Sequence, residues 1–130
     1  MATQSEELRA RTKRFAIRIV RLFKSLPKSD EARIIGKQLL RAGTAVAANY
    51  RAVCRARSKA EFIAKMGVVV EEADETVFWL ELLAETNTMP EARLRALLDD
   101  TNELLTIFAA SLWTARERRI VQSSNVSMAR

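Results

Sequence analysis

One stretch of the chain, Gln38–Arg57, decides the fold, and it reads QLLRAGTAVAANYRAVCRAR. Positions four and three residues apart fall on one side of a helix. Counted from the turn just before this stretch, one such side is mostly apolar and consists of Ile35, Leu39, Ala42, Val46, Asn49 and Val53. The opposite side carries small residues and positive charges, namely Lys37, Arg41, Thr44, Ala48, Arg51 and Arg55. The stretch therefore predicts a helix that packs on partner helices along one side and presents arginines along the other.

Composition extends this prediction to the whole chain. The 130 residues include only three glycines and two prolines, and 48% of them are hydrophobic. Few turn-forming residues and a large apolar fraction are typical of an all-α domain with a single hydrophobic core. A single cysteine, Cys54, excludes an internal disulfide, so we expect a reducing, cytoplasmic location. No stretch has the apolar length of a membrane span, so we expect a soluble protein without membrane contact.

Apolar repeats of the same period recur in four segments. They predict helices at about 5–26, 30–57, 59–87 and 90–118, which form one domain over residues 1–118. Pro27 ends the first helix because proline interrupts helical hydrogen bonding, and Ser58 with Glu61 forms a capping pair for the third. Residues 119–130 lack the repeat, so we expect a loose C-terminal tail. Short connections between long helices predict an antiparallel up-down four-helix bundle.

All three glycines, Gly36, Gly43 and Gly67, lie inside predicted helices. Glycine costs a helix about 1 kcal/mol relative to alanine, so its presence there indicates that another helix approaches closely. We expect Gly43 to mark such a tight crossing. Asn49 is the polar member of an otherwise apolar seam. We expect it to be structural, setting helix register or bonding to a neighbouring helix, rather than to bind a ligand.

The third helix carries a second apolar set away from its core side, interleaved with carboxylates. Its apolar members are Val68, Phe78, Trp79 and Leu82, and the carboxylates among them are Glu71 and Glu75. Large aromatic side chains left outside a small bundle are typical of interfaces. We therefore expect a homo-oligomer in which Glu71 and Glu75 meet arginines from the first or second helix of a neighbouring subunit. Alternatively, a splayed bundle buries these rings itself.

Charge is divided unevenly along the chain. Residues 1–70 hold 16 Lys or Arg against 5 Asp or Glu, whereas residues 71–130 hold 6 against 11. The candidate nucleic-acid-binding residues lie on the first two helices and are Arg11, Arg14, Arg18, Arg21, Lys37, Arg41, Arg51 and Arg55. Few aromatic residues separate these cations, which favours contacts to phosphates over stacking on bases. Two alternatives stay open. Charged helix faces are often only solvated, and this one could instead pair with acidic faces of sister subunits.

Residue types that dominate active sites are missing. The chain has no histidine, which removes the commonest general base and the commonest metal ligand. The acidic run Glu71–Glu75 lacks the histidines of a di-iron bundle site, and its seam position, Ala73, is apolar. We therefore expect a solvated or interface role for this run, a non-enzymatic protein, and no catalytic, cofactor-binding or metal-binding residues.

Gln38, Arg41, Ala42 and Asn49, followed by Phe62 in the next helix, form a pattern that is moderately specific to one bacterial family. Over roughly residues 10–115 the chain resembles the four-helix bundle proteins encoded in 23S rRNA intervening sequences. The accessory variability proteins of diversity-generating retroelements are related to that family. The resemblance implies a homo-oligomeric bundle, in known cases a pentameric barrel. For the retroelement relatives it also implies binding to nucleic acid and to a reverse transcriptase.

The chain departs from the family pattern at two places. Family members usually follow the asparagine with an apolar pair and then Glu-Gly, whereas this chain has Tyr50-Arg51-Ala52-Val53. A usual Gly-Ser in the third helix is replaced by Glu71-Glu72. The first change removes a carboxylate and adds a cation.

Together these observations predict a non-enzymatic homo-oligomeric bundle, assembled as a ring, that binds nucleic acid through a basic face on the first two helices. The family resemblance favours RNA over DNA. The alternative is a protein-interaction scaffold or accessory subunit, for example to a reverse transcriptase, whose basic face pairs with acidic protein surfaces.

Overall fold

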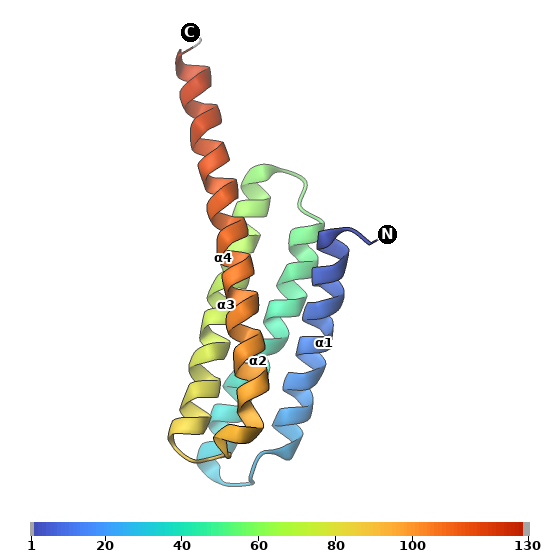
Figure 1. Ribbon diagram of the computed structural model, residues 1–130, viewed down its shortest axis with the longest axis vertical. Helices are drawn as coiled ribbons and strands as arrows, with labels where there is room; N and C mark the ends of the chain where they lie inside the picture. Colours follow the sequence, from blue (N-terminus) through green and yellow to red (C-terminus); the bar gives the residue numbers. More distant parts are fainter. Residues whose placement is uncertain (1, 129–130) are drawn as a thin grey trace.

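The computed structural model describes residues 2–128 and contains four α-helices (Figure 1). The helices are α1 (Gln4–Ser25), α2 (Asp30–Cys54), α3 (Lys59–Glu85) and α4 (Glu91–Met128). Helices and their connections account for these residues, with no strand among them. The predicted all-α class and the number of helices are confirmed.

Successive helices reverse direction at each short connection, so that α1 and α3 point one way and α2 and α4 the other (Figure 1). The closest packing joins helices that are neighbours in the chain, α1 with α2, α2 with α3, and α3 with α4. As a result α1 and α3 occupy opposite edges of the bundle in Figure 1. This arrangement decides which charged side chains can share a surface.

Hydroxyl side chains cap the starts of the first three helices. Thr3, Ser29 and Ser58 each accept a hydrogen bond from the backbone amide three residues further on. Such caps satisfy amides that have no partner within the helix. The predicted cap at Ser58 is confirmed. The Glu61 carboxylate, however, accepts a hydrogen bond from the backbone amide of Arg57, at 3.5 Å, instead of from that of Ser58.

Two helices end two or three residues earlier than the sequence predicts. α2 ends at Cys54 rather than at 57, and α3 ends at Glu85 rather than at 87. Asn87 has a φ of 57°, in the left-handed region that asparagine tolerates and that commonly follows a helix end. Each early end leaves a short connection that turns directly into the next helix.

Apolar side chains that recur three and four residues apart on each helix fill the core. The largest that are fully buried are Phe15, Ile19, Leu39, Val46, Val69, Leu80, Leu83, Leu94, Leu104 and Phe108. The seam of α2 is buried at Leu39, Val46 and Val53, whereas Asn49 is only half-buried. Periodicity therefore identified the inward side of α2 correctly.

Two of the three glycines lie at tight contacts between α1 and α2. A Cβ atom at Gly43 would lie 2.7 Å from Ile19 Cγ1, and one at Gly36 would lie 2.7 Å from Leu26 Cδ1. Real Cβ atoms do not approach other atoms this closely, so the predicted tight crossing at Gly43 is confirmed. Gly67 differs, because a Cβ there would meet nothing within 4 Å. The expected close approach at Gly67 is therefore wrong.

α4 continues well beyond the rest of the bundle (Figure 1). The sequence predicted a helix ending at 118 and a loose tail over 119–130, but the structure is helical as far as Met128. Residues 129–130 lie outside the described residues. No glycine or proline interrupts this segment, so nothing stops the helix where its apolar repeat ends. Neither α4 nor any other described helix is long and apolar enough to cross a membrane.

Candidate nucleic-acid interface

A basic groove of about 650 Å³ lies where the end of α2 meets the first turns of α3. Small and charged side chains line it, and they are Ala48, Arg51, Ala52, Arg55, Arg57, Glu61 and Lys65. The alanines leave the α2 backbone accessible between the arginines. Hereafter "the basic groove" means these seven residues.

Only part of the positive charge in the basic groove is neutralised there. The Lys65 ammonium lies 3.7 Å from the Glu61 carboxylate. Arg51 and Arg55 are exposed, and neither pairs with a carboxylate within residues 2–128. Four cations against one carboxylate leave a surplus of three positive charges. Guanidinium groups bind phosphate oxygens through paired N–H donors, so this surplus suits a phosphate backbone.

The groove includes two cations that sequence reasoning missed. Arg57 lies on the short connection after α2, and Lys65 lies in the second turn of α3. Because α2 ends at Cys54 and α3 begins at Lys59, the chain folds back at once and brings Lys65 beside the α2 arginines. The shortness of this connection was the signal that could have identified both residues.

Arg41, a predicted binding residue, is engaged by carboxylates of its own chain. Its guanidinium pairs with Glu75 and lies 3.3 Å from the carboxylate of Glu72, both on α3. The hydrogen bond to Glu75 raises the pKa of Arg41. Conversely, the hydrogen bond from Arg41, and then that from the Trp79 indole at 3.1 Å, lower the pKa of Glu75. Arg41 therefore ties α2 to α3 instead of extending the basic groove.

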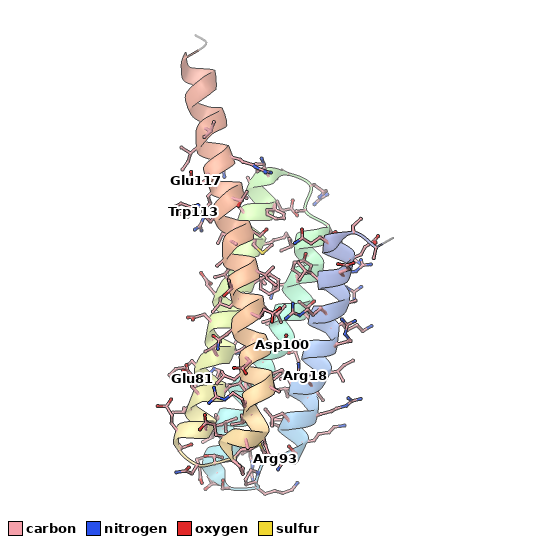
Figure 2. All side chains as sticks on the ribbon, viewed as in Figure 1. Arg18, Glu81, Arg93, Asp100, Trp113 and Glu117 are labelled. Carbon is pink, nitrogen blue, oxygen red and sulfur yellow. The ribbon has the colours of Figure 1, made fainter. Side chains whose placement is uncertain are left out.

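The arginines of α1 form two groups. Arg11 and Arg18 both donate hydrogen bonds to the Asp100 carboxylate of α4, at 2.5 and 3.0 Å. Figure 2 shows Arg18 beside Asp100. The hydrogen bond to Asp100 raises the pKa of Arg11. Arg14 and Arg21 are exposed, and no described carboxylate pairs with either of them. None of the four lies in the basic groove.

A single basic face on α1 and α2, as the sequence predicted, is therefore wrong. The cations of α1 border α4 or solvent, whereas those of the basic groove lie beside α3, across the bundle. Lys37 is exposed on α2 but lies outside the groove. The apolar seam of a helix determines which side of that helix faces the core. Which charged residues share a surface depends instead on the helices that pack on either side of it. Of the eight candidates, the structure brings Arg51 and Arg55 together in one groove.

The predicted interface residues of α3 are only partly exposed. Phe78 and Val68 are 53% and 39% exposed, and Glu71 is exposed as well. Trp79 and Leu82 are half-buried, and the Trp79 ring meets Phe78 edge-on with ring centroids 4.8 Å apart. The arginine expected to reach Glu75 from a neighbouring subunit is matched within the chain by Arg41.

Comparison with known proteins assigns this architecture to a family. Residues 5–110 match the family described as 23S rRNA-intervening sequence protein. The chain belongs to this family. It also matches the crystal structure of a protein of unknown function from the S23 ribosomal protein family of Bacteroides thetaiotaomicron. That match has a TM-score of 0.78 and 32% sequence identity, and it covers 85% of this chain and 98% of the other. No curated protein matches the chain.

In this member of the 23S rRNA-intervening sequence protein family, Asn49 bonds within its own helix. Its side-chain amide donates to the Ala45 carbonyl at 2.8 Å. The bond to a neighbouring helix that we considered is therefore not formed. Asn49 lies at the half-buried flank of the seam, where the carbonyl one turn earlier is within reach of its amide.

A cavity of about 950 Å³ lies in this family member at the end of the bundle from which α4 projects. Side chains from all four helices line it, including Leu8, Tyr50, Phe62 and Phe108. Burial raises the pKa of Tyr50 to about 12, so its hydroxyl stays protonated near neutral pH. Within the described residues, no three His, Cys, Asp or Glu side chains gather as a metal site would require. The basic groove is therefore the surface with the clearest chemical preference.

Proposed function

We propose that this protein is a non-enzymatic, cytoplasmic, homo-oligomeric bundle that binds RNA through the basic groove, mainly by contacts to phosphates. The observation that carries the proposal is the surplus of three positive charges on exposed side chains around a concave surface. Cations that neutralise phosphates release bound counterions, which gives sequence-independent affinity. Alanine walls between the cations let a phosphate approach closely.

RNA is proposed ahead of DNA because of the family alone. The family is described by its link to 23S rRNA intervening sequences. A charged groove that contacts phosphates carries little sequence information. We therefore expect preference for the shape of a structured RNA rather than for a base sequence.

We extend the proposal to the assembly, which by the family resemblance is a pentameric ring. The exposed Phe78 ring and the half-buried Trp79 ring beside it on α3 support an interface between copies, because contiguous exposed apolar patches are uncommon on monomers. Several grooves in one assembly would bind a long RNA together and raise its apparent affinity.

A salt titration of RNA binding tests this function. Labelled structured RNA and duplex DNA are titrated with wild-type protein and with an Arg51→Ala/Arg55→Ala variant, from low to high salt. Three neutralised phosphates per groove predict a slope of log K against log salt of about −2 to −3, and removing two cations makes it shallower by about 1.4–1.8.

The matched control is an Arg33→Ala/Arg93→Ala variant, which removes the same charge from exposed positions outside the groove. We expect this control to bind RNA with nearly the wild-type slope. Equal loss in both variants would mean that net charge, rather than the groove, is responsible. No binding at low salt, with the oligomer intact, would reject the nucleic-acid function.

The second candidate is a protein-interaction scaffold or accessory subunit, for example to a reverse transcriptase, whose basic groove binds an acidic protein surface. The observation that favours it is that Arg11 and Arg41 already pair with carboxylates of this chain. Retained oligomer mass without RNA binding would support this candidate.

A further inference from the structure

The outermost face of α3 is an acidic strip. It consists of residues three and four apart, namely Glu71, Asp74, Phe78, Glu81 and Glu85. All five are exposed, and Phe78 is 53% exposed at the centre of the strip. None of the four carboxylates pairs with a cation within the described chain, and Glu81 projects from the outer edge of α3 in Figure 2. The strip is therefore a row of unneutralised negative charge around one apolar ring.

The outermost face of α1 is a matching basic strip. Its members are also three and four apart, namely Arg14, Ile17, Arg21 and Lys24. All four are exposed, and Ile17 is 42% exposed between the cations. Its three cations have no carboxylate partner among the described residues, unlike Arg11 and Arg18 on the flank that faces α4. Both strips thus share one design, an apolar side chain among unpaired charges of one sign.

The two strips cannot meet within one chain. α1 and α3 lie at opposite edges of the bundle, so each strip points away from the other (Figure 1). Both strips do lie at the same level, in the half of the bundle away from the projecting end of α4, and α1 and α3 run in the same direction (Figure 1). Consider a second copy that is related to the first by rotation about an axis parallel to the helices. The basic strip of this second copy can then lie against the acidic strip of the first without any shift along that axis.

We propose that the basic strip of one copy binds the acidic strip of the next, with Ile17 and Phe78 as apolar anchors inside the interface. Single exposed ion pairs add little affinity, but a row of complementary charges fixes partner and orientation. Two different surfaces meet in this contact, so the assembly is head-to-tail, and it closes into a ring when the rotation from one copy to the next divides a full turn. The contact presupposes the homo-oligomer proposed above, and it leaves the basic groove, in the other half of the bundle, open to RNA.

Charge reversal on each strip tests the contact. One variant carries Arg14→Glu, Arg21→Glu and Lys24→Glu on α1, and a second carries Asp74→Lys, Glu81→Lys and Glu85→Lys on α3. Each variant places like charges opposite one another, so we expect its mass to fall to the 14.7 kDa of one chain. A third variant that combines all six substitutions again has opposite charges on the two strips, and we expect it to regain the wild-type mass.

Light scattering after size exclusion gives the masses, and circular dichroism confirms that each variant is helical. The matched control is Arg51→Glu/Arg55→Glu/Arg57→Glu, which changes the same charge in the basic groove and should keep the wild-type mass while losing RNA binding. Wild-type mass in both single-strip variants would overturn the proposed contact while leaving the homo-oligomer standing. Failure of the six-fold variant to reassemble would also overturn it, because the strips would then not bind each other.

A monomeric wild-type protein would overturn both this contact and the homo-oligomer. RNA binding by that monomer would still support the basic groove, since its titration does not depend on the strips. The two proposals therefore fail separately.

Discussion

Replacing Gly43 with alanine tests the tight contact between α1 and α2. The new Cβ would lie 2.7 and 2.9 Å from Cγ1 and Cγ2 of Ile19. Ile19 is fully buried, and both atoms are attached directly to its Cβ, so moving them aside requires isoleucine to leave the one χ1 rotamer that a helix strongly prefers. Forcing an extra methyl group into such a site costs about 1–3 kcal/mol, while the change from glycine to alanine in a helix returns about 1 kcal/mol. We expect Gly43→Ala to lower the free energy of unfolding by up to about 2 kcal/mol.

Gly67→Ala is the matched control for this substitution. Gly67 is also inside a helix, but a Cβ there meets nothing within 4 Å, so only the gain in helix propensity of about 1 kcal/mol remains. The difference between the two variants removes the propensity term and isolates the steric cost. Urea unfolding followed by circular dichroism, at one protein concentration, measures it. In an Ile19→Ala background, Gly43→Ala should no longer destabilise the protein; equal stability of the two glycine variants in the wild-type background would refute the reasoning.

Three further predictions concern charged and titratable groups. Arg41 and Trp79 lower the pKa of Glu75, so its contribution to stability is present above the unfolded value of about 4.3 and is lost as the pH falls through the folded pKa. In the Glu75→Gln variant, the free energy of unfolding should therefore fall less steeply as the pH is lowered, as measured by urea unfolding at a series of acidic pH values. Burial raises the pKa of Tyr50 to about 12, so stability should decline as the pH rises above about 10, the unfolded value, and Tyr50→Phe should remove that decline. As the only tyrosine, Tyr50 should show no tyrosinate absorbance at pH 10 until the protein unfolds. Asp100→Ala should cost about 1–2 kcal/mol in urea unfolding because it removes the carboxylate that Arg11 and Arg18 share, which leaves Arg18 unpaired and Arg11 with Glu103 alone, whereas exposed Asp99→Ala should cost less than about 0.5 kcal/mol.

Periodicity predicted the parts of the fold that depend on one helix at a time. The seam residues Leu39 and Val46 are buried because a repeat of four and three residues places them on one side of α2, whatever lies opposite. The close approach at Gly43 followed from the helix cost of glycine. The same reasoning failed at Gly67, which lies on α3 with open space around it. Glycine indicates a close contact only where a partner helix is present.

The candidate site was harder to predict because it depends on how helices are rotated against each other. Sequence spacing put Arg41 and Arg51 on one side of α2, but it carried no information that Glu72 and Glu75 of α3 would face Arg41 while Lys65 joined Arg51. Those pairings arise where two helices meet, and no single-helix repeat records them. The helical continuation of α4 was missed for a related reason, since an apolar repeat reports packing rather than helix formation.

The order of packing along the chain has a consequence for folding kinetics. Because the closest contacts join consecutive helices, most native contacts close short loops, and proteins rich in such contacts fold within microseconds to milliseconds. The hydrogen bond from Arg11 to Asp100 joins residues 89 positions apart, so closing that loop costs more chain entropy than a contact between consecutive helices. We therefore expect this pair to form after the rate-limiting step. Loss of Asp100 would then accelerate unfolding and leave the folding rate almost unchanged.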